Sequence, residues 1–166
     1  MVVLLLVAVA WLGFRTVRAF DQDRHAAAAA AVLAAPDKVS YELPPVPGEP
    51  SRPDVGPAGR LSYRPGTWLS VVDLQGLEPG AGDERYLVFL RNWAGWTLAG
   101  AARPGVDGTA QVRSGAEPRP PTIYEVVVTR AVDDATSVPH GQPVLHWFDA
   151  SLAPPKARQF DFARGA

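Results

Sequence analysis

Short apolar runs recur along the chain, and turn-forming residues separate them. Many runs alternate apolar and polar positions with a period of two and are rich in β-branched and aromatic residues, which is typical of strands. The pattern predicts seven or eight short strands, at Lys38–Leu43, Arg60–Tyr63, Trp68–Asp73, Arg85–Leu90, Gly95–Gly100, Thr109–Arg113, Thr122–Thr129 and Gln142–Trp147. Strands at this spacing predict an antiparallel β-sandwich over residues 38–148.

The run Arg85–Leu90 is apolar on both of its alternating faces. A strand of this kind is expected at the centre of a sheet that is covered on both sides. A sandwich also needs apolar inner faces. The residues expected to form them are Trp68, Val72, Leu74, Tyr86, Val88, Leu90, Leu98, Val126, Val128 and Val144.

The first 14 residues carry no charged side chain. As a helix they would span about 20 Å, against roughly 30 Å of bilayer hydrocarbon. A signal peptide, a core helix and the distal part of a transmembrane helix all fit such a run. The positive region of a signal peptide is missing, and Arg15 and Arg18 follow the run as at a membrane boundary. We therefore expect a transmembrane helix over residues 1–20, in contact with membrane lipid and beginning upstream of Met1.

Two further segments flank the expected sandwich. Residues 21–37 begin with acidic side chains and continue into an alanine run that Pro36 ends, which predicts a solvated juxtamembrane helix or linker. Residues 149–166 form a polar tail with Phe160 and Phe162. We expect this tail to be loosely ordered or docked on a partner.

Composition limits the chemistry. The 166 residues include no cysteine, which excludes disulfides and thiolate metal sites, and the net charge of −1 gives no bulk electrostatic reason to bind nucleic acid. His25, His140 and His146 lack the spacing of metal ligands, and Ser137 lacks the context of a catalytic nucleophile. We predict a non-enzymatic protein without catalytic, cofactor-binding or metal-binding residues.

Trp93 and Trp96 flank Ala94-Gly95 in a predicted turn. Aromatic side chains at a turn bury a large area at a small entropic cost, so they suit a contact with a protein partner. The alternative is that one or both fold back over the end of the sandwich. Both residues are candidate partner contacts.

The central strands and their turns carry a set of residues that recurs in a known family. These residues are Leu77, Pro79, Gly80 or Gly82, Tyr86, Leu90, Ala99, Gly100, Asp107 and Gly108, followed near the end by Val128, Thr129, Pro139, Gly141, Pro143, Val144 and Leu145. With them the chain resembles the extracytoplasmic C-terminal domain of the anti-sigma-K factor family, and the similarity covers about Val32–Leu145. Phe89 stands where the family has tryptophan, and Leu87 replaces its glutamine.

This resemblance implies a bacterial, single-pass cell-membrane protein with an immunoglobulin-like sandwich outside the cytoplasm. It implies the sensory or regulatory outer domain of an anti-sigma factor, with sigma-regulatory machinery as its partner. The family's cytoplasmic sigma-binding segment is not part of the match. Arg15, Arg18 and Arg24 would by themselves place the sandwich in the cytoplasm, but we give the resemblance more weight.

Two other functions stay open. The sandwich could be an accessory subunit that docks on a larger membrane complex. It could also be a secreted or periplasmic ligand-binding domain, which requires that the N-terminal segment be cleaved as a signal peptide.

Overall fold

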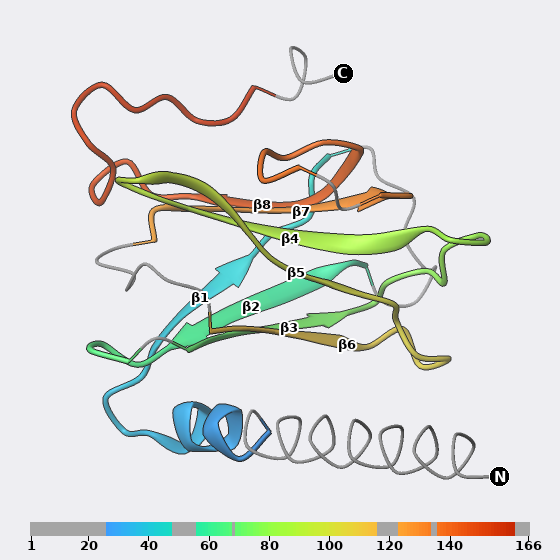
Figure 1. The fold of residues 1–166 in the computed structure, drawn as a ribbon, viewed down its shortest axis with the longest axis horizontal. Coiled ribbons are helices and arrows are strands. Elements are labelled where there is room, and N and C mark those ends of the chain that lie inside the picture. The colour runs from blue at the N-terminus through green and yellow to red at the C-terminus, as the bar shows by residue number, and fades with distance from the viewer. Residues whose placement is uncertain (1–25, 48–55, 68, 116–122, 134–135, 162–166) are drawn as a thin grey trace, which may run out of the picture.

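The computed structural model describes residues 26–47, 56–67, 69–115, 123–133 and 136–161. Its strands form two antiparallel sheets stacked face to face (Figure 1). The first sheet has the order β1-β2-β3-β6 and the second the order β5-β4-β7-β8. The strands are β1 Val39–Leu43, β2 Ala58–Tyr63, β3 Ser70–Gln75, β4 Arg85–Asn92, β5 Gly95–Ala102, β6 Ala110–Ser114, β7 Glu125–Ala131 and β8 Gln142–Phe148. The predicted β-sandwich is confirmed.

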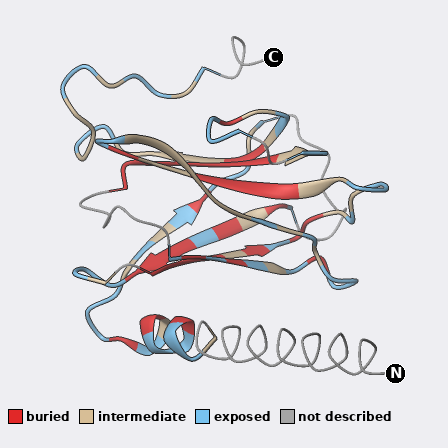
Figure 2. Cartoon of the chain, viewed as in Figure 1, coloured by how far each residue is buried: buried red, intermediate tan, exposed pale blue. Residues whose placement is uncertain are grey.

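The main hydrophobic core lies between the two sheets and is formed by residues of both. Buried residues, in red, occupy strands of each sheet (Figure 2). The central position predicted for β4 is confirmed. Val88 faces this core, whereas Leu87 and Phe89, on the opposite face of β4, are also fully buried. The predicted core residues found here are Val72, Leu74, Tyr86, Val88, Val126, Val128 and Val144, with Leu90 packed against them.

Leu98 was predicted on the inner face, and this prediction is wrong. A bulge between Val88 and Phe89 shifts the pairing of β4 with β5, so that Leu98 stands opposite Phe89. Because an extra residue in one strand moves the side chains beyond it to the other face, Leu98 packs with the outward-facing Phe89. Ala99 packs against the core instead. Trp68, another predicted core residue, lies outside the described residues.

The chain itself connects the two sheets at one side of the sandwich. After β1 it runs beside β8, where the backbone N–H of His146 donates to the Pro44 oxygen at 3.0 Å and that of Val46 to the Val144 oxygen at 2.9 Å. Prolines in this stretch lack an N–H, but their carbonyls still accept. The edge of the second sheet at β8 is therefore partly paired.

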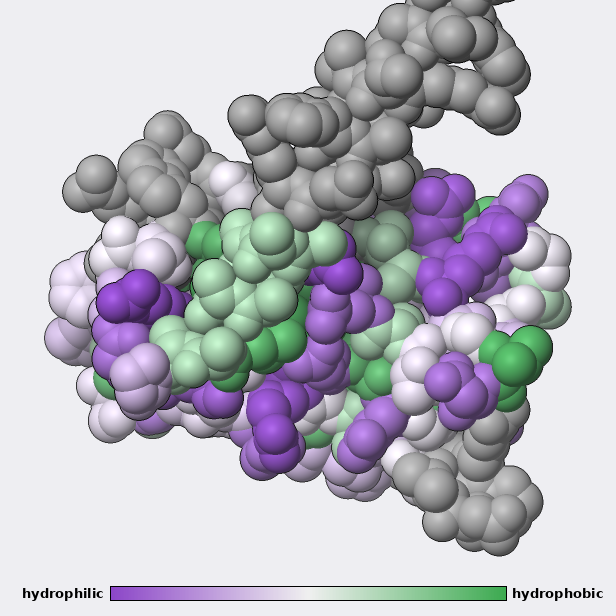
Figure 3. Space-filling model, turned by 90° about the horizontal axis from the view of Figure 1, so that it is seen from below, coloured by the Kyte–Doolittle hydropathy of each residue, from purple (hydrophilic) through white to green (hydrophobic). Residues whose placement is uncertain are grey.

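A helix over residues 26–34 covers part of the outer face of the first sheet (Figure 1). Ala29, Val32 and Leu33 lie on one side of this helix and pack against Leu69 and Val71. A helix is found within residues 21–37, where a solvated juxtamembrane helix or linker was expected, and one side of it is buried on the sheet because the alanine run conceals an apolar stripe. Seen from below, apolar surface lies among polar side chains on this face (Figure 3).

Within the described ranges, no helical segment combines the length and apolar character needed to cross a bilayer. The segment expected to span the membrane, residues 1–20, lies outside those ranges.

The C-terminal segment, residues 149–161, runs back across the outer face of the second sheet (Figure 1). It had been expected to be loosely ordered or docked on a partner. Over these residues it lies on the chain's own domain, and its contacts there lead to the candidate site.

Candidate binding site on the second sheet

The pairing of strands places two rows of side chains on the outer face of the second sheet. Arg91 of β4 stands opposite Trp96 of β5 on one side and Glu125 of β7 on the other. Alternate residues of a strand share a face. A second row therefore lies two residues along, and it consists of Leu98, Phe89, Val127 and His146.

Glu125 is the polar centre of this face and is fully buried. Its Oε2 accepts a hydrogen bond from Arg91 Nη1 at 2.9 Å, and its Oε1 lies 3.0 Å from His146 Nε2. The backbone N–H of Phe160 donates to Oε1 as well, at 2.6 Å. A buried carboxylate is costly unless it is paired and hydrogen-bonded. Three donors from three parts of the chain meet that requirement here.

The two partner side chains of Glu125 are also held from other directions. Arg91 Nη1 donates to the backbone oxygen of Arg158 at 2.9 Å, and its guanidinium lies 5.2 Å from the Trp96 ring centre and 5.6 Å from that of Tyr124. His146 Nδ1 lies 3.2 Å from the side-chain nitrogen of Gln159.

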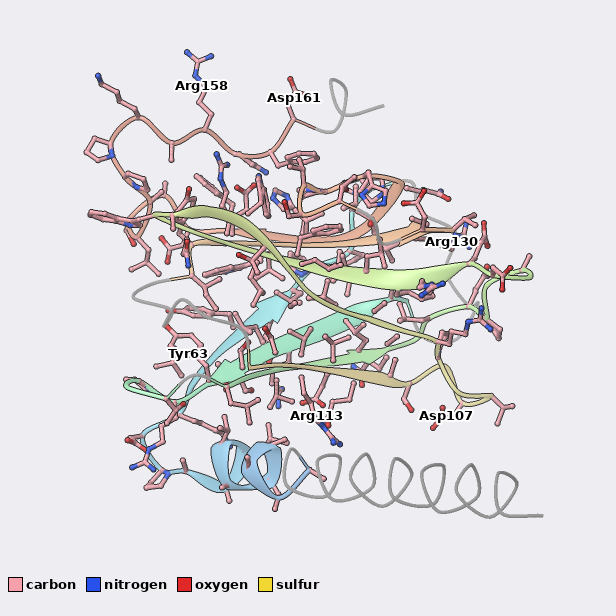
Figure 4. All side chains as sticks on the ribbon, in the orientation of Figure 1. Tyr63, Asp107, Arg113, Arg130, Arg158 and Asp161 are labelled. Carbon is pink, nitrogen blue, oxygen red and sulfur yellow. The ribbon has the colours of Figure 1, made fainter. Side chains whose placement is uncertain are left out.

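The C-terminal segment thus contacts this face mainly through its main chain and one ring. The Phe160 ring meets Trp96 edge-on, with centroids 5.6 Å apart and an interplanar angle of 86°. It also packs against the apolar cluster of Leu87, Phe89 and Val127. The side chains of Arg158 and Asp161 point away from the sheet (Figure 4). Arg91 and Glu125 thus form hydrogen bonds with the backbone of the segment, and the Phe160 ring packs on an apolar surface.

Both predicted partner-contact residues lie beside the C-terminal segment. Trp96 packs under Phe160, and the Trp93 indole N–H donates to the backbone oxygen of Leu152 at 3.1 Å. Trp93 remains 67% exposed. The structure therefore shows contacts with the chain's own tail, and a contact with another protein stays a prediction for both residues.

Sequence reasoning missed Glu125 and Arg91. A signal was present, since Glu125 is the one charged residue in the run Thr122–Thr129. A charged residue in an otherwise apolar strand is buried only when it is paired. The register that places Arg91 opposite Glu125 depends on the pairing of β4 with β7, strands more than 30 positions apart.

A second covering lies farther along the same face, in the loop before β8. His140 packs edge-on against Phe89, with ring centres 5.7 Å apart. Its Nδ1 lies 3.0 Å from the Val138 oxygen and 2.8 Å from Thr136 Oγ1, and its Nε2 lies 3.0 Å from the Asp133 oxygen. The Val138 carbonyl, followed by Asp133, raises the pKa of His140 against a smaller opposing effect of burial.

These partners decide what His140 can do. Acceptors at both ring nitrogens favour the imidazolium, which donates twice, over a neutral ring able to take up a proton. His140 is therefore better suited to holding its loop in place than to acting as a general base. In the described part of the chain, no group of three or more acidic or histidine side chains is placed to hold a metal ion. His25 lies outside that part.

No family model, curated protein or solved structure matches this chain. The interpretation of the site therefore depends on its own geometry. In that geometry the face holds two main-chain groups and one aromatic ring of the chain's own C-terminal segment.

Proposed function

We propose that this chain is a non-enzymatic, single-pass membrane protein whose β-sandwich lies outside the cytoplasm and binds a protein partner. In this proposal residues 1–20 anchor the chain in lipid, and the sandwich acts like the sensory or regulatory outer domain of an anti-sigma factor. The resemblance of Val32–Leu145 to that family supports the regulatory part.

The strand order supports the finer proposal of an immunoglobulin-like sandwich. In immunoglobulin domains the second and fifth strands pair in one sheet, while the third pairs with the sixth in the other. Here β3 pairs with β6, and β4 pairs with β7, which is flanked by β8. In this assignment β3, β4, β6, β7 and β8 correspond to strands B, C, E, F and G, and β5 is an additional strand beside C.

The observation that carries the binding role is the buried Glu125 with Arg91 beside it. Together they hold a main-chain N–H and a main-chain carbonyl of an irregular segment. Arg91, Glu125 and the Trp96 ring each contact a main-chain group or the ring of that segment, as the groups of a peptide-binding surface do. A binding module accounts for the whole cluster.

The membrane topology can be tested because the chain has no cysteine. Val106 is 95% exposed in the loop between β5 and β6. We expect Val106→Cys to fractionate with membranes and to react with a membrane-impermeant maleimide in intact cells. Val72→Cys, at a buried core position, is the matched control and should react only after denaturation.

Labelling of Val106→Cys only after the cells are opened would contradict an extracytoplasmic sandwich. Recovery of the uncleaved protein in the soluble fraction after the cells are broken would contradict the membrane anchor. If the protein were instead purified from membranes in a fixed stoichiometry with a larger assembly, the role of accessory subunit would replace that of regulator.

A further inference from the structure

The contacts of the C-terminal segment separate into two kinds. Main-chain atoms of Arg158 and Phe160 bind Arg91 and Glu125, and these contacts do not depend on the segment's side chains. The Phe160 ring and the Gln159 amide add contacts that do depend on side chains. A site that combines main-chain hydrogen bonds with a receptive surface for one ring has the features of a peptide-recognition site.

We propose that this face, formed by Arg91, Trp96, Glu125 and His146, is a peptide-docking site that the chain's own residues 156–161 occupy. A partner would replace them with an extended segment that carries an aromatic side chain. The proposal deepens the binding role given above and rests on that role, but it does not depend on membrane topology.

The chemistry of the partner follows from the groups that the site presents. Arg91 requires a carbonyl of the bound peptide, and Glu125 requires the N–H of the peptide residue two positions later. An extended chain offers the carbonyl of one residue and the N–H of the second residue after it on the same side, as it does to a neighbouring strand. The ring of that second residue enters the space beside Trp96, and a polar amide between the two reaches His146.

The site would remain intact when its own segment leaves. Glu125 keeps its pairs with Arg91 and His146, and the Arg91 guanidinium keeps its places over the Trp96 and Tyr124 rings. A buried carboxylate that keeps two cationic or hydrogen-bonding partners does not force the sheet to unfold. Release therefore leaves a preformed surface with one free acceptor position on the Glu125 carboxylate, and preformed surfaces bind with a smaller ordering cost.

The occupying segment is held lightly by comparison. Arg158, Gln159 and Asp161 are exposed, and Phe160 is half-buried. Its advantage over a partner is its attachment, since a short connection to β8 gives the segment a high effective concentration at the site. Weakening the attached segment should therefore open the site to a peptide in solution.

The test uses the purified full chain in detergent and a fluorescent peptide with the sequence of residues 156–161, Lys-Ala-Arg-Gln-Phe-Asp, blocked at both ends. Binding is measured by fluorescence polarisation. We expect Phe160→Ala in the protein to bind the peptide about tenfold more tightly than the wild type, because the attached competitor is weakened. The same peptide with Ala in place of Phe is the matched control and should not bind measurably.

A second variant locates the binding. Trp96→Ala, added to Phe160→Ala, should abolish peptide binding while circular dichroism shows an unchanged β-sheet spectrum. Equal peptide affinity of the wild type and Phe160→Ala would overturn the proposal, as would binding that ignores the peptide's Phe. A dimer that forms only when Phe160 is present would also overturn it, in favour of tail exchange between two copies. Each result is independent of where the labelling experiment places the sandwich.

Discussion

The two outer faces of the sandwich are each covered by a terminal part of the described chain, but by different kinds of contact. The helix over residues 26–34 covers the first sheet with Ala29, Val32 and Leu33 on Leu69 and Val71, all apolar. The C-terminal segment covers the second sheet through hydrogen bonds to buried polar groups and the Phe160 ring.

Under the proposed docking role, this difference separates a lasting contact from an exchangeable one. Apolar contact is non-directional, and it is lost to water when the helix leaves the sheet. Hydrogen bonds to Glu125 and Arg91 require a donor and an acceptor in fixed places, but another chain can supply the same groups. The first sheet therefore has an anchoring face and the second a selective one.

The largest loss of stability is expected when the buried Glu125 of the selective face is replaced. Glu125→Ala removes the carboxylate that Arg91 and His146 share. Breaking a buried pair by removing one partner costs about 3–5 kcal/mol, because the other charge is left without compensation. We expect the free energy of unfolding, measured by urea denaturation, to fall by that amount.

The exposed Asp161→Ala provides the control for Glu125→Ala, with a change expected within about 0.5 kcal/mol. A loss below about 1 kcal/mol for Glu125→Ala would mean that the buried cluster adds little to the fold. The selective face would then contribute little to the stability of the sandwich.

An intermediate effect is expected at the anchoring face. Val71 is fully buried beneath the helix. Val71→Ala removes two carbon groups, worth about 0.8 kcal/mol each, and leaves a small cavity. We expect the free energy of unfolding to fall by about 2 kcal/mol, with faster proteolysis within residues 26–34.

Val106→Ala makes the same chemical change at an exposed position and should be neutral within about 0.5 kcal/mol. If Val71→Ala matched this control, the helix would not depend on its apolar stripe. The contrast between the two faces would then fail on the first sheet.

The sequence predicted the strands of this fold better than the tertiary contacts of their side chains. All eight strands were located because alternation and turn residues are local signals. The double burial of β4 was also readable, since Leu87 and Phe89 alternate with Tyr86 and Val88. By contrast, the face of Leu98 was missed because it depends on a bulge, which pairing decides and composition does not.

The candidate site was missed for the same physical reason. Trp96 was singled out by its type and its turn, and it does lie at the site. The groups that define the site come from β4, β7, β8 and residues 158–160, which only the tertiary fold brings together. Local pattern carries no information on such long-range contacts, so a lone charge in an apolar strand was the available clue.

The smallest effect concerns pH, and it applies only to the selective face. His140 packs on Phe89, and its pKa is raised because the carbonyls of Val138 and Asp133 and the Asp133 carboxylate favour the imidazolium. Thr136 Oγ1 completes its surroundings. A raised pKa stabilises the fold fully below the unfolded value of 6.5, and this contribution is lost as the pH rises through the higher folded value.

We therefore expect the free energy of unfolding to decrease slightly from pH 5.5 to pH 8 in the wild type, and less so in His140→Gln. About a quarter of the His140 side chain is exposed (26%), so solvent weakens the effect. The cluster that packs the helix on the first sheet, Ala29, Val32, Leu33, Leu69 and Val71, consists of apolar side chains, which do not titrate. Protection factors from hydrogen exchange, corrected for the intrinsic pH dependence of the exchange rate, should accordingly differ between pH 5.5 and pH 8 in residues 136–140 and not in residues 26–34. The same pH dependence in both regions would remove the distinction between a titratable face and an apolar one.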